Sequence, residues 1–149
     1  MTPRPPSPRE DFAAYAERAW PRLYRTAHLL TGDPRAAREL ARATLADTYA
    51  RRRRMPRDDA DFYVRRTLVR RYLRHARRLA RGAGERPLLF HALGRLGRRQ
   101  RVVLVLRHGE HLAEAEIAEV LGCSVGAVRS YARRGLSALG PLPVSGVGR

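Results

Sequence analysis

Residues 112–139 have the sequence LAEAEIAEVLGCSVGAVRSYARRGLSAL, and this stretch decides the fold that we expect. Ala118 is small at a point where two helices would cross closely, and Gly122 follows where a tight turn needs a positive φ angle. Ser124 then suits the N-cap of the next helix. The residues that would supply the buried contacts are Ile117, Val120, Leu121, Val125 and Val128. The pattern predicts a helix-turn-helix with helices over residues 114–121 and 124–139.

The second helix of this unit has a basic outer face. A helix-turn-helix places its second helix in the major groove of DNA, with the N-terminal residues toward the bases. The residues that this geometry brings near a duplex are Gly126, Ala127, Arg129, Ser130 and Arg133. Arginine can form two parallel hydrogen bonds with guanine, and Arg134 is placed for a phosphate. The simpler interpretation is a helical hairpin with solvated arginines, but the joint pattern of small, turn, cap and basic residues favours DNA binding.

Helix signals also dominate the rest of the chain. The pattern predicts helices at about 8–31, 34–54, 58–81, 88–96 and 98–108. Pro21 should kink or split the first of them, and Asp33 should cap the second. We therefore expect an all-α fold of two small domains, an N-terminal bundle of three or four helices and a C-terminal helix-turn-helix domain. The expected boundaries are 8–81 for the first domain, 82–87 for a short linker, 88–140 for the second domain and 141–149 for a flexible tail.

The composition limits the partners of the chain. It has 149 residues and a formal net charge of +17, and all 31 of its basic residues are arginine. A charge this far from zero attracts polyanions, so nucleic acid is the expected partner. No apolar run reaches the roughly 18 residues of a membrane-spanning helix, and the N-terminus lacks the apolar core of a signal peptide. We therefore expect a cytoplasmic protein.

The sequence offers no candidate catalytic centre. It contains no paired Cys/His spacing typical of a metal site, no Gly-rich phosphate loop and no nucleophile beside a suitable base. His108 and His111 are close in sequence, but Gly109 lies between them at a predicted helix end, which argues against a metal pair. We expect neither enzymatic activity nor a bound metal or cofactor.

The predicted third helix is rich in arginine. Residues 51–81 contain 13 Arg and three Asp, a local net charge of +10. Basic side chains follow phosphates and aromatic faces stack on unpaired bases, so the mixture with Tyr63 and His75 suits single-stranded or melted DNA as well as duplex. The alternative is a solvated basic face over a helical core that includes Tyr72.

Three stretches together resemble a known family. They are WPRLYRTAHLLTGD at 20–33, YVRRTLV at 63–69, and RQR at 99–101 followed by AEIAEVLGCSVGAV at 115–128. This combination resembles the sigma-70 family of RNA polymerase sigma factors, and more narrowly its two-domain, extracytoplasmic-function group in actinobacteria. The resemblance runs from about Phe12 to Leu139. It implies a factor that binds core RNA polymerase and directs promoter recognition and transcription initiation.

The resemblance also implies roles for particular residues. Residues 8–81 would correspond to sigma region 2, which binds the polymerase and the −10 element, and residues 88–140 to sigma region 4, which binds the −35 element. The polymerase-binding residues would be Glu39, Leu40, Thr44 and Leu45. The −10 contacts would be Arg65, Arg66, Arg70, Arg71 and His75. The −35 contacts would be Ser124, Gly126, Ala127, Arg129, Ser130, Arg133 and Arg134. Promoter DNA and core polymerase are thus the implied partners. The resemblance also implies an anti-sigma factor as a further partner.

The chain departs from the family pattern in three places. At 39–43 it has ELARA, where the family usually has Asp-Leu-Val-Gln and an acid, and Ala113 replaces a Ser or Thr cap. The linker is several times shorter than in relatives, and its seven residue steps span at most about 25 Å. The two promoter elements lie on the order of 50 Å apart. The sequence therefore leaves open a divergent sigma-like protein or a stand-alone helix-turn-helix regulator, and also an RNA-binding or charge-driven scaffold.

Overall fold

The chain folds into helices joined by short turns within residues 8–54, 59–79 and 87–140, which are the residues that the computed structural model describes. Every regular element in these ranges is helical. The elements are α1 (Pro8–Thr31), α2 (Pro34–Ala50), the 3₁₀ turn η1 (Arg52–Arg54), α3 (Ala60–Leu79), α4 (Leu88–Gly94), α5 (Arg98–Leu104), the π-helical turn η3 (Val105–Gly109), α6 (Glu114–Leu121) and α7 (Val125–Leu139). The expected all-α fold class is confirmed.

The turn between α1 and α2 follows the sequence prediction closely. Gly32 has a φ angle of 72°, and the Asp33 side chain accepts a hydrogen bond from the amide of Ala36 at 2.9 Å. Pro21 does not split the helix, because α1 is continuous through this residue; a kink there stays a prediction. Pro21 is exposed, so water can reach the carbonyl that loses its helical partner there.

Three predicted helix ends differ from the structure. The second helix ends at Ala50 rather than near Arg54, since the backbone tightens into η1 beyond Arg51. The Arg52 guanidinium lies 3.9 Å above the centre of the Tyr49 ring, which supports this tighter turn. The helix expected at 88–96 stops at Gly94, and the one expected at 98–108 is α5 continued by the wider turn η3.

The helix-turn-helix has the predicted geometry. Helix α6 covers Glu114–Leu121, and Gly122 takes the left-handed conformation with a φ angle of 69°. The amide of Gly122 donates to the carbonyl of Ala118 at 2.8 Å, which closes the turn. The Ser124 hydroxyl accepts from the amide of Ala127 at 3.1 Å and so caps α7. Glu116 accepts from the amide of Ala113, which partly replaces the missing cap on α6.

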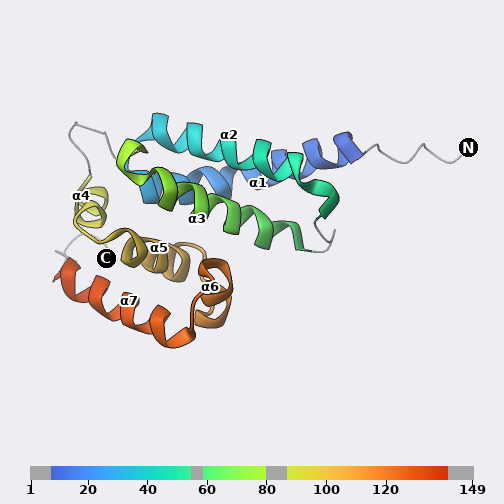
Figure 1. Ribbon diagram of the computed structural model, residues 1–149. Helices are drawn as coiled ribbons and strands as arrows, with labels where there is room; N and C mark the ends of the chain where they lie inside the picture. The colour runs from blue at the N-terminus through green and yellow to red at the C-terminus, as the bar shows by residue number, and fades with distance from the viewer. Residues whose placement is uncertain (1–7, 55–58, 80–86, 141–149) are drawn as a thin grey trace, which may run out of the picture.

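Helices α1–α3 form one layer and α4–α7 lie beneath it, as Figure 1 shows. A single buried cluster connects the two layers, because Leu68 and Tyr72 of α3 belong to the same core as Val102, Leu106 and Ile117. No helix within the described residues is long and apolar enough to cross a membrane. The predicted linker at 82–87, apart from Pro87, and the predicted tail at 141–149 lie outside the described residues.

Candidate nucleic-acid interface

Helix α7 presents its basic side to solvent. Arg129, Arg133 and Arg134 are exposed, and so are Ser124 and Gly126 at the start of the helix. Ala127 and Ser130 are half-buried beside them. The opposite side is fixed in the core: Val128 is buried, and Gly135 lies so near Leu104 of α5 that an added Cβ would come within 2.9 Å of its side chain. The −35 residues expected from the sequence therefore lie along one accessible stretch of α7.

Arg129 has a partner within the helix-turn-helix itself. Its Nε donates to a carboxylate oxygen of Glu114 at 2.7 Å. The two side chains are 68% and 38% exposed, so solvent screens the pair and it contributes little stability. Because the pair is open to solvent, the Arg129 guanidinium can exchange Glu114 for a base edge.

The arginines of α3 divide between different faces. Arg65 points to the lower layer and pairs with Glu110 at 2.9 Å, whereas Arg71 turns to Asp47 of α2 at 3.7 Å. Arg70 is exposed on the outer side of the helix. Burial, followed by the positive charges of neighbouring arginines, lowers the pKa of its guanidinium. The neighbouring arginines in that cluster are Arg66, Arg51 and Arg74. The five residues expected at the −10 element thus do not form one surface.

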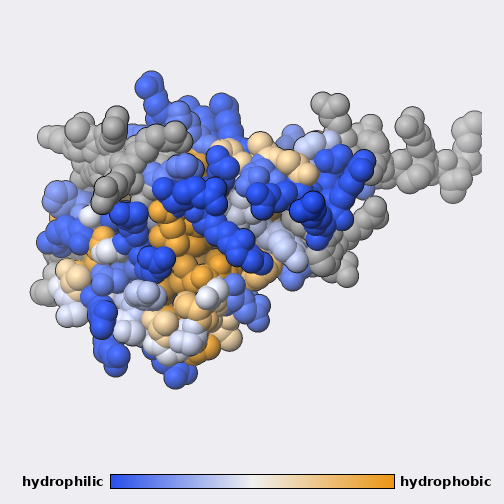
Figure 2. Space-filling model, viewed as in Figure 1, coloured by the Kyte–Doolittle hydropathy of each residue, from blue (hydrophilic) through white to orange (hydrophobic). Residues whose placement is uncertain are grey.

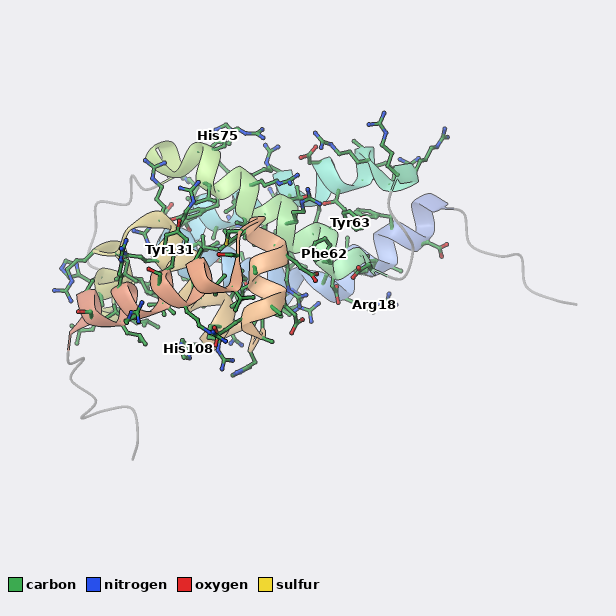
Figure 3. All side chains as sticks on the ribbon, turned by 60° about the horizontal axis from the view of Figure 1, so that its bottom comes forward. Arg18, Phe62, Tyr63, His75, His108 and Tyr131 are labelled. Atoms are coloured by element: carbon green, nitrogen blue, oxygen red, sulfur yellow. The ribbon has the colours of Figure 1, made fainter. Side chains whose placement is uncertain are left out.

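Aromatic side chains lie at the start of the same helix. Figure 3 shows Phe62 and Tyr63 side by side, and their ring centres are 5.4 Å apart in an edge-on arrangement. Both rings are half-buried. His75 lies toward the other end of α3, where its φ and ψ angles of −115° and 16° interrupt the helix. His75, the histidine of the predicted −10 set, therefore lies at the opposite end of α3 from Phe62 and Tyr63.

The predicted polymerase-binding residues lie mostly inside the bundle. Leu40 and Thr44 are buried, and the Thr44 hydroxyl donates to the carbonyl of Leu40 at 2.7 Å. Leu45 is half-buried and Glu39 is exposed. The outward face of α2 consists of Arg35, Arg38, Glu39, Arg42, Ala46 and Ala50. Of the four expected residues, Glu39 is the one whose side chain is placed to meet a partner directly.

Arg101 is an organising residue that sequence reasoning missed. Its guanidinium donates to the carbonyls of Leu93 at 2.8 Å, Leu96 at 2.9 Å, Gly94 at 3.2 Å and Leu30 at 3.3 Å. It also donates to the phenol of Tyr72 in a short hydrogen bond. The RQR motif at 99–101 marked the position, but the sequence pattern does not distinguish a structural arginine from one that binds DNA.

Acidic side chains gather at the edge of the seam between the layers. Asp59 and Asp61 of the upper layer and Glu116 and Glu119 of α6 line a groove of about 490 Å³. Burial alone would raise the pKa of Asp61, but hydrogen bonds from Tyr15 and Arg22 and the Arg22 charge lower it overall. Burial and the contact with Asp61 raise the pKa of Tyr15, so the phenol remains protonated. Across the described residues, no group of His, Cys, Asp and Glu side chains is arranged to hold a metal ion.

Comparisons with known proteins agree with the geometry. The family model for sigma-70, region 4, matches residues 87–139. An RNA polymerase sigma-E factor of Streptomyces coelicolor is 33% identical over 148 residues, covering 87% of this chain and 84% of that protein. One of Streptomyces antibioticus is 35% identical over 136 residues, covering 78% of this chain and 76% of that protein.

A solved structure shares the fold. The sigma factor RpoE of Bartonella quintana, in complex with the anti-sigma factor NepR, matches with a TM-score of 0.74 and 19% identity. The match covers 93% of this chain and 99% of that one, so it includes both helical layers. The Streptomyces relatives also span both, and the resemblance found in the three sequence stretches is confirmed. The chain belongs to the sigma-70 family of RNA polymerase sigma factors, in its extracytoplasmic-function group.

Proposed function

We propose that this chain binds core RNA polymerase and directs it to promoters with a −10 and a −35 element. The observation that carries the proposal is the extent of the family match, which includes α1–α3 as well as the helix-turn-helix. A stand-alone regulator would need only the second part. The sigma role needs no covalent chemistry from the chain, because its effect is to bind melted promoter DNA more tightly than closed DNA elsewhere.

Each layer has a separate task in this proposal. Residues 8–81 bind the polymerase and the −10 element, residues 88–140 bind the −35 element, and residues 82–87 join them. Exposure supports Arg129 and Arg133 as the base contacts and Arg134 as a phosphate contact. The outward cluster around Arg70 supports phosphate binding along α3. Glu39 represents the polymerase-binding face of α2.

Further partners and location follow from the same role. Core RNA polymerase is cytoplasmic, and we place this chain there with it. The solved relative is held by an anti-sigma factor, and we propose that a protein of that class can also bind this chain.

Reconstituted transcription tests the function. Purified chain is added to core RNA polymerase with a template library randomised at the −35 and −10 positions, and the transcripts are sequenced. We expect a stable complex with core and enrichment of particular sequences at both elements. Replacing both Arg129 and Arg133 by Ala should abolish enrichment at −35 alone. Arg18→Ala, which removes an exposed arginine from α1, is the matched control and should change neither element. Sequence-specific DNA binding without a core complex would instead establish a stand-alone regulator.

A further inference from the structure

Beside the apolar core that the two layers share, a buried carboxylate adds a polar contact between them. Glu110 follows the π-helical turn η3, and its side chain is 5% exposed. One of its oxygens accepts from Arg65 of α3 at 2.9 Å, and the other accepts from the Thr26 hydroxyl of α1 at 3.1 Å. Arg25 donates to the neighbouring carbonyl of Gly109 at 2.9 Å. Both oxygens of this acid in the lower layer are therefore bound by the upper layer.

The backbone that positions Glu110 is unusual. The turn η3 is wider than an α-helix, and π-helical turns of this kind often occur at functional sites. His111, the next residue, has a φ angle of 57°, a left-handed conformation that disfavours residues other than glycine. Such a conformation persists only where surrounding contacts hold it in place. The contacts of Glu110 with α1 and α3 are of that kind.

The ion pair with Glu110 also makes Arg65 unavailable to DNA in the closed form. The Arg65 side chain is only 19% exposed while it is bound to Glu110, whereas Arg70, further along the same helix, faces solvent. Leu112 is buried in the same core cluster as Val64 and Leu68 of α3. Figure 2 shows hydrophobic surface continuing along this seam, between α3 and the region of α5 and α6.

The closed arrangement brings the two DNA-binding parts into contact. Helix α6 of the helix-turn-helix packs directly on α3. The −10 and −35 elements lie on the order of 50 Å apart along the duplex, at about 3.4 Å per base pair. Separation of the layers would bring the two DNA-binding parts closer to this spacing.

We propose that Glu110 is a latch that binds Arg65, holds the free chain closed, and must release Arg65 before this arginine can contact the −10 strand. The purpose of opening rests on the proposed sigma function, but the latch itself does not. A buried pair of this kind gives a conformation specificity, and removal of one partner leaves the other charge buried and uncompensated. Glu110 thus favours the closed form only while Arg65 is opposite it.

Energy transfer between dyes measures the latch without any transcription. Ala14→Cys and Ser137→Cys, both at exposed positions, place one dye on each layer in a Cys123→Ser background of the full chain. We expect Glu110→Gln to lower the transfer efficiency and to raise the open population about tenfold or more. Glu119→Gln removes the same charge from exposed α6 and is the matched control. Equal efficiencies in Glu110→Gln and Glu119→Gln would overturn the latch.

A charge-swapped variant distinguishes loss of the ion pair from a general folding defect. The double variant Arg65→Glu with Glu110→Arg recreates the pair in the opposite sense, and we expect it to return toward the closed efficiency. Circular dichroism melting shows whether each variant remains helical. If the swap stays as open as Glu110→Gln while remaining folded, the ion pair is not the latch.

Binding of a labelled single-stranded DNA 12-mer of random sequence tests the release of Arg65. One additional phosphate contact steepens the dependence of log K on log salt by about 0.7 for single strands. We expect this change for Glu110→Gln relative to Glu119→Gln, and no change when Arg65→Gln is added to Glu110→Gln. An unchanged slope of log K against log salt would overturn the part of the proposal in which released Arg65 binds DNA. Failure of the wild-type chain to initiate transcription with core would count against the sigma function alone, because energy transfer reports closure independently.

Discussion

Replacing Arg101 by Ala should destabilise the whole chain, although this residue belongs to a protein with 31 arginines. The guanidinium of Arg101 binds the carbonyls at the end of α4, the Leu30 carbonyl of α1 and the phenol of Tyr72 in α3. It therefore joins three helices that are distant in sequence. Its planar set of donors fits several carbonyls at once, which a lysine ammonium cannot reproduce.

The size of the effect depends on which acceptors water can reach. A hydrogen bond to a charged group contributes about 1.5–3 kcal/mol, but such values do not add for one side chain. The Gly94 carbonyl belongs to an exposed residue and can be hydrated after the change. Leu30 and Tyr72 are about 1% exposed, so their oxygens would be left buried without this donor. We therefore expect a loss of about 3–5 kcal/mol in the free energy of unfolding, because two buried acceptors left without a donor cost about 1–3 kcal/mol each.

Urea denaturation followed by circular dichroism measures this loss. With an m value of about 2 kcal/mol/M, the midpoint should fall by about 2 M. Arg99→Ala is the matched control, because Arg99 is exposed on the same helix. Arg101→Lys should recover little of the stability. The reasoning is refuted if Arg101→Ala lies within about 0.5 kcal/mol of Arg99→Ala, the usual range for surface substitutions.

Three further changes test separate parts of the molecule. Gly122→Ala places a side chain at a φ angle of 69° and should cost about 1–2 kcal/mol, seen as a lower thermal midpoint; a midpoint equal to wild type would mean that the turn relaxes. Arg129→Ala should relax the preference at one base pair of the −35 element by about 1–3 kcal/mol in competition binding, and an unchanged preference removes this residue from base recognition. Asp61→Asn should cost at most about 1 kcal/mol near neutral pH, since the pair with Arg22 is half-exposed. Because the folded pKa of Asp61 is lowered, its contribution is present above about pH 4 and is lost as pH falls through the folded value. Urea titrations of both forms should therefore converge in acid, and a difference that persists there would contradict the assignment.

Local signals in the sequence predicted local structure well. Asp33, Gly122 and Ser124 each determine a helix boundary through contacts with residues fewer than five positions away. The information needed for such a boundary lies within the same short segment. Pro21 did not split α1, because its effect there depends on whether water can reach the freed carbonyl, and exposure is a property of the tertiary fold.

The candidate site was less predictable because neighbouring arginines have unrelated surroundings. Arg65 and Arg66 are adjacent in sequence, but successive residues of a helix point about 100° apart. Only the packing of α3 against the lower layer decides that Arg65 meets Glu110. Glu110 has no motif around it, and its partners lie 45 and 84 positions away. Composition alone could not separate arginines with structural roles from those free to bind DNA.

In the closed form, the free chain would offer some of its arginines to DNA and keep Arg65 bound to Glu110. Arg70 and Arg74 on α3, and Arg133 and Arg134 on α7, face solvent in the closed form. They can follow phosphates without any opening, and phosphate contacts give affinity with little sequence preference. Arg65 is the predicted −10 residue that closure withholds through its ion pair with Glu110. If opening is coupled to the polymerase, non-specific attraction to DNA and engagement of the −10 strand are controlled separately, although both depend on arginines of the same helix.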